Sequence, residues 1–145
     1  MNFSITKELK EYNQIYKELN EIYHSMALKT GLSDSAFDIF YAIAVIGDGC
    51  LQRDICQMTF LSKQTIHSSV RKLEKEGYLA LKKGSGRSIH LHLTSAGEAL
   101  VREKVLPFIE IEEKSFEDMT LDQAHELLRL NKKYASRLRE NAEAL

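Results

Sequence analysis

The chain has 145 residues, 43% of them hydrophobic, which suits one globular domain with a packed core. Its formal net charge of −1 neither favours nor excludes a nucleic-acid partner until the distribution of charge is considered. Two cysteines make no disulfide framework, no apolar run approaches the roughly 18 residues of a membrane span, and the N-terminus lacks a signal peptide's apolar centre. We therefore expect a cytoplasmic protein.

The N-terminal segment from about Ile5 to Lys29 is predicted to form a helix. Its apolar side chains alternate by four and three residues, a heptad-like seam made of Ile5, Leu9, Tyr12, Tyr16, Leu19, Tyr23 and Met26. Ile15 and Ile22 widen this stripe, so the helix is expected to contact more than one neighbour. Gly31 is expected to end it.

Two further helices are expected before the middle of the chain. Ser33 can cap a second helix that ends near residues 47–49, where two glycines flank an aspartate. Its inner face is predicted to carry Phe37, Phe40, Ile43 and Ala44. A short third helix is expected from about Leu51 to Met58.

The stretch SKQTIHSSVRKLEKEGYL, from Ser62 to Leu79, predicts an amphipathic fourth helix. Ile66, Val70 and Leu73 recur at the spacing that places residues on one helix face, and we expect that face to be core. Ser62 is a good N-cap residue, and Gly77 lies where helices commonly end. The outer face carries Lys63, Gln64, His67, Ser68, Arg71 and Lys72.

After Gly77 the pattern changes to the alternation of half-buried strands, in LALKK at 79–83 and SIHLHLT at 88–94. The glycine-containing segment between them predicts a β-hairpin with a flexible, positively charged tip. Residues 62–87 carry a formal charge of about +5, so the rest of the chain sums to about −6. A polyanion would suit this basic segment, although a solvated helix face would carry the same charges.

The helical period returns at Ser95, with Leu100, Val101, Val105, Phe108 and Ile109 on one side. Pro107 is expected to bend or loosen this helix, because it lacks an N–H group and crowds the preceding turn. Thr120 and Gln123 form a capping-box pair that opens a last helix. The apolar members of that helix include Leu127, Leu128, Leu130, Tyr134 and Leu138.

The order of these elements predicts a winged helix-turn-helix: a short helix, a tight turn, a second helix with polar outer residues, and a cationic hairpin as the wing. The expected fold class is mainly α with a small β-hairpin wing, in a single domain over 1–145. A DNA-binding lobe at 33–94 would be flanked by helices at 1–30 and 95–145. These flanking helices cannot all bury their stripes on so small a module, so we expect a homodimer.

The outer face of the fourth helix is suited to reading duplex DNA. Short polar side chains near its N-terminus can reach base edges, and these are Gln64, Thr65, His67 and Ser68. Cations and the positive end of the helix dipole would meet phosphates, at Ser62, Lys63, Arg71 and Lys72. In the wing, Arg87 could enter a minor groove, and Lys82 and Lys83 could contact phosphates or only keep an edge strand soluble.

Three stretches of the chain, LQRDICQMTFLSKQTIHSSVRKLEKEGYL, KKGSGRSIHLHLT and SAGEAL, resemble the MarR family of bacterial winged-helix transcription regulators. Residues 61–65 match the family's leucine-serine-lysine-x-threonine start of the recognition helix, and residues 73–77 match its leucine-glutamate-x-x-glycine exit. The wing retains Arg87, but Ser85 stands where the family usually has an aspartate. Residues 93–97 match the threonine-capped start of the dimerisation helix.

The resemblance covers essentially the whole chain and implies a homodimer that places one recognition helix of each subunit in the major groove of a palindromic site. Family members often lose DNA affinity when a small, frequently aromatic, ligand binds between the dimerisation and DNA-binding parts. Aromatic residues that could line such a pocket, or could equally be core, are Tyr12, Tyr16, Tyr23, Phe37, Tyr41 and Phe108. We therefore predict a sequence-specific transcription regulator, most simply a repressor released by a small ligand.

Two alternatives stay open. A winged-helix module whose basic face meets an acidic protein would share these features without binding DNA. A redox-gated regulator would need a reactive thiolate, and Cys50 lies near the N-terminus of the third helix, which favours one. Cys56 is expected to be a packed, inert thiol.

Other chemistry has little support in the sequence. His90 and His92 share one face of a strand but lack a third ligand nearby, so we expect no metal site. No spacing typical of a catalytic triad, phosphate-binding glycine loop or carboxylate pair occurs. We therefore expect neither an enzyme nor a cofactor.

Overall fold

The computed structural model of the chain describes residues 4–145 and confirms the mainly helical fold with one hairpin. The elements are α1 (Lys7–Thr30), α2 (Asp34–Ile46), α3 (Gln52–Met58), α4 (Lys63–Lys75), β1 (Leu79–Lys83), β2 (Ile89–Leu93), α5 (Ser95–Leu100), the π-helical turn η1 (Val101–Val105), α6 (Leu106–Glu117) and α7 (Leu121–Ala142). The chain divides into two compact units, of which the first ends at Pro107 and the second is Phe108–Leu145.

Serine and threonine side chains set where five helices begin. In each case the side-chain oxygen accepts a hydrogen bond of 3.1–3.4 Å from the backbone N–H three residues later. These N-caps are Thr6, Ser33, Ser62, Thr94 and Thr120. The predicted caps are therefore confirmed, and the first helix begins at Lys7 instead of Ile5 because Thr6 caps it.

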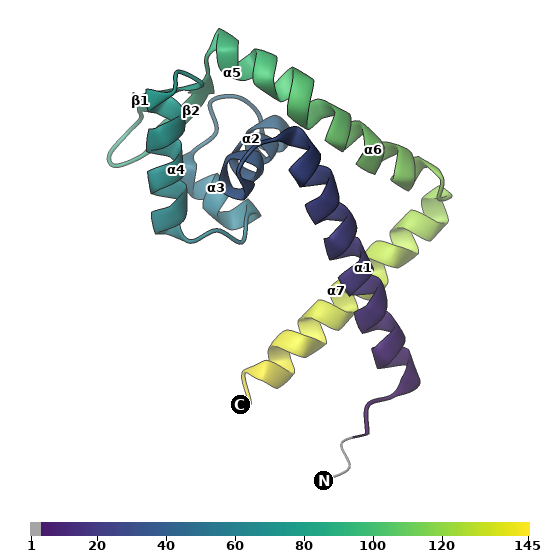
Figure 1. Cartoon of the computed structure of the whole chain (residues 1–145). Helices are drawn as coiled ribbons and strands as arrows, with labels where there is room; N and C mark the ends of the chain where they lie inside the picture. The colour runs from purple at the N-terminus through teal and green to yellow at the C-terminus, as the bar shows by residue number, and fades with distance from the viewer. Residues whose placement is uncertain (1–3) are drawn as a thin grey trace. The chain divides into compact units, whose positions relative to one another are not determined.

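Helix α2 lies at the centre of the first unit and packs against α1, α3, α4 and η1 (Figure 1). Its side chains Ile39, Phe40 and Ile43 are at most 1% exposed. The ring of Phe40 also meets the ring of Tyr78 edge-on, with 6.2 Å between the ring centroids. Burying each such aliphatic or aromatic side chain contributes about 1.5–3 kcal/mol, so α2 adds several kcal/mol to the stability of this unit.

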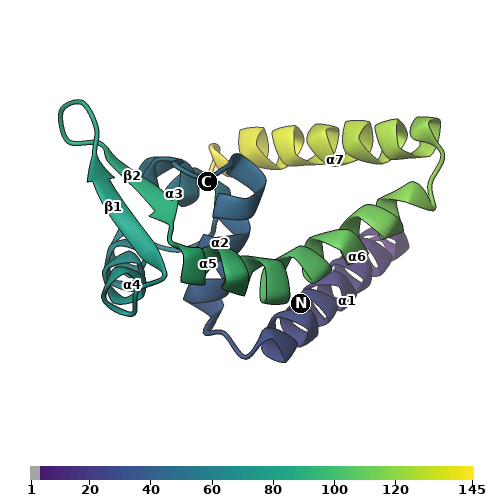
Figure 2. The same cartoon turned by 90° about the horizontal axis from the view of Figure 1, so that it is seen from above.

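The two strands form an antiparallel hairpin that runs from Leu79 opposite Leu93 to Lys83 opposite Ile89. The other edge of β2 pairs with the loop between α2 and α3. There the Gly49 N–H donates to the Leu91 carbonyl oxygen and the Leu91 N–H donates to the Cys50 carbonyl oxygen, both at 2.9 Å. Figure 2 shows the loop between β1 and β2 projecting beyond the helices of the first unit. The predicted wing is thus present, and its base is tied to the helical core.

A π-helical turn lies immediately before Pro107. The Leu106 N–H donates to the carbonyl oxygen of Val101, five residues earlier, whereas an α-helix would use the residue four earlier. Proline cannot donate a backbone hydrogen bond, and its ring crowds the carbonyl group four residues before it. The wider turn relieves this crowding, so the predicted loosening of the helix at Pro107 is confirmed.

Apolar side chains stay exposed on two helices. On α1, five members of the predicted seam are 36–56% exposed, and these are Leu9, Tyr12, Tyr16, Leu19 and Tyr23. On α7, members of the predicted apolar stripe are 40–54% exposed, among them Leu127, Leu130 and Leu138. Amphipathic helices of globular proteins normally bury such stripes, so each helix retains a surface suited to a further partner.

Replacing Gly97 by alanine tests the close approach of α5 to the base of the wing. Alanine favours a helix over glycine by about 1 kcal/mol, but its Cβ would collide with the backbone carbonyl oxygen of Tyr78. That oxygen already accepts a 3.0 Å hydrogen bond from the Thr94 N–H and cannot move aside freely. We expect Gly97→Ala to lower the free energy of unfolding in urea by about 1–2 kcal/mol.

The matched control is Ala96→Ser, at the exposed neighbouring position of the same helix. It should change the free energy of unfolding by no more than about 0.5 kcal/mol. An unfolding midpoint of Gly97→Ala at or above that of the wild type would contradict the close contact.

Candidate nucleic-acid interface

Helix α4 has two chemically distinct faces. Ile66, Val70 and Leu73 are at most 4% exposed and lie on the side packed against α2 and β1. The opposite face is exposed and carries Gln64, His67, Ser68, Arg71 and Lys75. The predicted amphipathic helix is confirmed, and burial of its apolar face directs the polar face to solvent.

The first turn of α4 is held by a local hydrogen-bond network. The Ser62 hydroxyl oxygen accepts a 3.1 Å hydrogen bond from the Thr65 N–H and lies 2.8 Å from the Thr65 hydroxyl oxygen. The Ser68 hydroxyl donates to the Thr65 carbonyl oxygen at 3.0 Å. Thr65 is half-buried, whereas Gln64 and His67 are exposed. Of the four predicted base-reading residues, Gln64 and His67 are therefore the best placed to reach a partner.

Two of the predicted phosphate-binding cations form ion pairs with carboxylates of their own helix. The Arg71 guanidinium lies 3.0 Å from the Glu74 carboxylate, and the Lys72 ammonium lies 3.9 Å from the Glu76 carboxylate. Both pairs are largely solvent-exposed, so each is worth no more than about 1 kcal/mol. A phosphate group could therefore displace either carboxylate at small cost.

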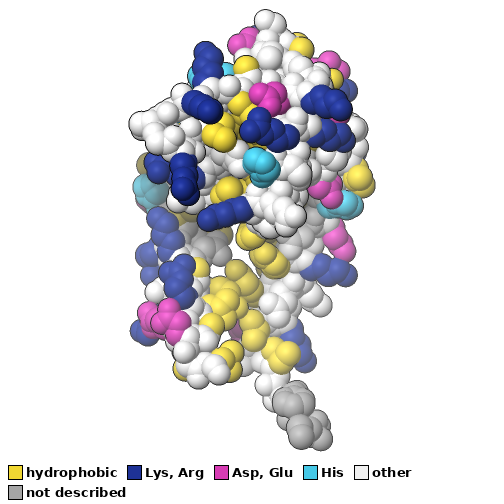
Figure 3. All heavy atoms as spheres, turned by 90° about the vertical axis from the view of Figure 1, so that its left-hand side faces the viewer, with side chains coloured by type: hydrophobic (Ala, Val, Ile, Leu, Met, Phe, Trp, Pro, Cys, Tyr) yellow, Lys and Arg dark blue, Asp and Glu magenta, His cyan; other side chains and the backbone are white. Residues whose placement is uncertain are grey.

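Hydrogen bonds close the tip of the wing. The Gly84 N–H donates to the Ser88 carbonyl oxygen at 3.0 Å, and the Ser88 hydroxyl donates to the Ser85 carbonyl oxygen at 2.7 Å. Ser85, which replaces the aspartate usual in the resembled family, thus contributes through its backbone. Figure 3 looks onto the side that carries α4 and the wing, and Lys and Arg side chains gather in the upper part of that face. The predicted wing cations, all exposed, are Lys82, Lys83 and Arg87.

The base of the wing is anchored by contacts that the sequence did not reveal. Asp48 accepts a 2.6 Å hydrogen bond from the Leu93 N–H and a 3.1 Å hydrogen bond from His92 Nδ1. His90 Nδ1 donates to the Gly49 carbonyl oxygen at 2.8 Å. Partial burial alone would raise the pKa of Asp48, but the hydrogen bonds from Leu93 and His92 outweigh it and hold that pKa below its usual range. Both strand histidines therefore fasten the wing to the loop between α2 and α3.

The surroundings of Cys50 do not favour the thiolate that the redox-gated alternative needs. Its side chain is buried, and burial, followed by the nearby Asp54 and Asp48 carboxylates, raises the pKa of the thiol to about 11. The thiolate is the form that reacts with oxidants, so redox gating through Cys50 loses its chemical basis. Cys56, expected to be packed, is only half-buried.

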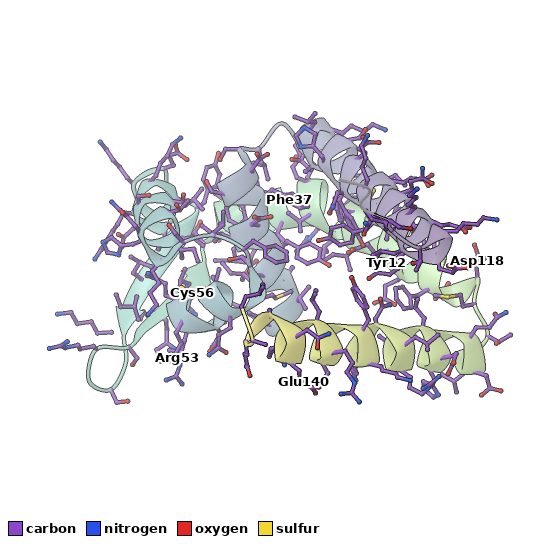
Figure 4. The ribbon with its side chains drawn as sticks, turned by 90° about the horizontal axis from the view of Figure 1, so that it is seen from below. Tyr12, Phe37, Arg53, Cys56, Asp118 and Glu140 are labelled. Carbon is purple, nitrogen blue, oxygen red and sulfur yellow. The ribbon has the colours of Figure 1, made fainter. Side chains whose placement is uncertain are left out.

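The aromatic residues predicted to line a ligand pocket lie in different surroundings. Phe37 on α2 is 6% exposed, and its ring centroid lies 5.9 Å from that of Tyr41. Tyr12 and Tyr16 on α1 are 36% and 56% exposed, and Figure 4 shows Tyr12 and Phe37 on their two helices. Phe108, which begins the second unit, is 6% exposed. Within the first unit the structure thus brings Phe37 and Tyr41 into contact.

Two exposed side chains near the candidate interface were missed by sequence reasoning. Phe60, in the turn between α3 and α4, is fully exposed. Arg53, on the first turn of α3, borders a cavity shared with the wing. No local pattern singles out Arg53, because its position beside the wing depends on the pairing of distant segments.

Comparisons with known proteins identify the same arrangement. The MarR family model matches residues 30–87, from the end of α1 to the wing tip. A MarR family regulator from Neisseria meningitidis aligns with a TM-score of 0.81 at 18% identity, over 95% of this chain and 98% of that chain. Residues 30–87 thus match the MarR family, and the chain has the fold of solved MarR-family regulators. The predicted resemblance is therefore confirmed.

Other solved structures show that the MarR fold extends over nearly the whole chain. The DNA complex of MepR from Staphylococcus aureus aligns with a TM-score of 0.62 at 19% identity, over 93% of this chain and 99% of that chain. BpsR from Bordetella bronchiseptica aligns with a TM-score of 0.61 at 20% identity, over 92% of this chain and 97% of that chain. The DNA binding of BpsR is regulated by 6-hydroxynicotinic acid. A search of curated protein sequences finds no match. MarR-family proteins are transcription regulators and not enzymes, as expected for this chain.

Over residues 4–145, no helix is both long enough and apolar enough to cross a membrane. In the same part of the chain, no three His, Cys, Asp or Glu side chains are grouped where they could hold a metal ion.

Alkylation should be slow at Cys50 in the folded MarR lobe. The rise in pKa from 9.0 to about 11 lowers the thiolate fraction near neutral pH about 100-fold, and burial adds a steric barrier. In Cys56→Ser, which leaves Cys50 as the remaining cysteine, mass spectrometry should show little iodoacetamide adduct until urea unfolds the protein. Equal rates of alkylation in the folded and unfolded states would refute protection of Cys50.

Proposed function

We propose that this protein is a homodimeric, sequence-specific repressor of transcription that acts in the bacterial cytoplasm and is released from DNA by a small ligand. The observation that carries the proposal is α4, whose apolar face is buried while its polar face is exposed beside a cationic wing. A helix of this kind fits the major groove, and a wing can reach the adjacent minor groove. The DNA complex of MepR, which shares the fold, supports this mode of binding.

The side chains of α4 and the wing would divide the work of DNA recognition. Gln64 and His67, with Thr65 and Ser68 behind them, would contact base edges. Ser62, at the positive end of the helix dipole, would help to hold a phosphate. Cations around the interface would contact further phosphates or the minor groove, and these are Lys63, Arg71, Lys72, Lys82, Lys83 and Arg87.

The exposed apolar stripes on α1 and α7 support a homodimer. Leu19 on α1 and Leu130 on α7, for example, are 48% and 49% exposed. Pairing with a second copy would remove both stripes from water, and a two-fold dimer would present two α4 helices to a palindromic operator. Residues 1–30 and 95–145 would then supply the dimer contacts, and residues 33–94 the DNA-binding lobe.

A small aromatic ligand would bind beside the rings of α2. Phe37 and Tyr41 already pack together, and α1 contributes Tyr12 and Tyr16 to the same unit. Aromatic rings can stack on such a ligand while tyrosine hydroxyl groups orient it. Regulation of BpsR by 6-hydroxynicotinic acid supports a ligand of this class.

Selection of duplex DNA from a random pool tests the proposed function. With non-specific competitor at near-physiological salt, the purified protein should enrich an inverted repeat whose half-sites lie about one helical turn apart. Such a repeat would support both direct reading of sequence and the dimer. If no site is enriched and the purified protein instead binds an acidic protein, the result would favour a protein-binding module.

Two substitutions on α4 should separate base reading from phosphate contact. Gln64→Ala should cost about 1–3 kcal/mol on the selected site and relax the preference at one base pair. Lys72→Ala should weaken binding to selected and scrambled duplexes alike, because a phosphate contact carries no sequence information. Fluorescence anisotropy on both duplexes measures these effects.

The control is Gln57→Ala, which shortens an exposed side chain of α3, outside α4 and the wing. It should leave both affinities unchanged. A wild-type preference profile in Gln64→Ala would remove Gln64 from the base-reading set.

A further inference from the structure

A cavity of about 410 Å³ separates the start of α3 from the wing. One wall comes from Leu51, Gln52 and Arg53, and the other from Ser85, Arg87, Ser88 and Ile89. All of these residues belong to the first unit. The cavity is therefore built between two segments whose relative placement the structure defines.

Hydrogen bonds at the base of this cavity hold its two walls at a set spacing. The Leu91 N–H donates to the Cys50 carbonyl oxygen at 2.9 Å, and Leu51 forms an antiparallel bridge with His90. The Asp54 carboxylate accepts a 3.1 Å hydrogen bond from the Leu51 N–H. The start of α3 and the wing thus share a backbone frame, which positions side chains above it with little freedom left to lose on binding.

Each polar side chain that lines the cavity has a hydrogen-bond donor, and of these the Ser88 hydroxyl already donates to the Ser85 carbonyl oxygen. The lining includes the guanidinium groups of Arg53 and Arg87, the amide of Gln52 and the hydroxyl groups of Ser85 and Ser88. No carboxylate is among the lining residues. Such a set suits an oxyanion of phosphate, because guanidinium groups bind phosphate oxygens in a bidentate manner. The chemistry of the lining thus favours phosphate over a cation or an apolar ligand.

Arg53 is available for such a contact. Its nearest ion-pair partner is the adjacent Asp54, at 3.6 Å, and the Arg53 side chain is 76% exposed. An exposed pair at this distance is weak, and a guanidinium group has five N–H donors to offer. Figure 4 shows the Arg53 side chain leaving α3 next to the wing hairpin.

We propose that this cavity binds a phosphodiester group of the DNA backbone, held between Arg53 and Arg87. The inference rests on the proposed DNA-binding function and adds Arg53 as a contact outside the recognition helix and the wing. With α4 in a major groove and the wing at the adjacent minor groove, the strand between the two grooves passes the start of α3. A phosphate seated there would fix how far the wing enters the groove, since it locks the DNA strand to the same frame as Arg87.

The first test compares Arg53→Ala with Gln57→Ala, which shortens another exposed side chain of α3. Arg53→Ala should weaken binding about tenfold on both selected and scrambled duplexes. The slope of log affinity against log salt should also become shallower by about 0.9, the value for one lost phosphate contact. Gln57→Ala should match the wild type in both respects, and Arg53→Lys should fall between the wild type and Arg53→Ala.

A second test locates the contact on the DNA. Single phosphodiesters of the selected duplex are replaced, one at a time, by uncharged methylphosphonates. At one linkage in each half-site the replacement should weaken wild-type binding but have no further effect on Arg53→Ala. If Arg53 had only a structural role, Arg53→Ala would bind more weakly than the wild type by the same factor whichever linkage was replaced. Matching thermal unfolding of the two proteins by circular dichroism would confirm that the variant is folded.

The outcomes separate this inference from the proposed function. If the wild type binds DNA and Arg53→Ala has the same affinity and salt slope, the inference is overturned but the proposed function is not. The wild type could instead bind inorganic phosphate saturably, with Arg53→Ala abolishing that binding and leaving DNA binding unchanged. This result would assign the cavity to a free phosphate compound and would also overturn the inference. Absence of DNA binding by the wild type would overturn the proposed function and the inference together.

Discussion

The contact between the apolar faces of α2 and α4 is the interaction on which the rest of the first unit depends. Phe40 and Ile43 on one side and Ile66 and Val70 on the other are at most 1% exposed, so α4 has a single stable rotation about its axis. That rotation alone decides which side chains of α4 reach solvent. The polar residues at the start of α4 are therefore presented to a partner as a consequence of core packing, and their positions need no further support than the Ser62 cap.

The wing depends on the same core through the loop that follows α2. A two-stranded hairpin is barely stable by itself, and here β2 gains a second neighbour in the loop that leaves α2. Asp48 and the two strand histidines add side-chain bonds to this junction. Because α2 also packs on α4, helix α4 and the wing are held in one frame. This common frame is what would allow base contacts, minor-groove contact and the proposed phosphate site to be made simultaneously.

Charge and burial act locally in this protein. A net charge of −1 conceals a basic segment, and the ion pairs on α4 show that even this segment is partly neutralised within its own helix. Burial has the opposite consequence for Cys50, whose position near a helix N-terminus favours a thiolate but whose surroundings raise the pKa of the thiol. In both cases the immediate environment of a side chain, and not its type or sequence neighbours, decides what it can do.

The sequence by itself determined the helices, their caps, the hairpin and the buried face of α4, because hydrophobic periodicity and capping depend on residues a few positions apart. It also identified Gln64, His67 and Arg87 as exposed candidates. Only the tertiary structure decided that Asp48 anchors the wing, that Cys50 is protected, and that Arg53 lies across a cavity from Arg87. These features depend on segments brought together by the folded core or on desolvation there, and no local pattern in the chain encodes either.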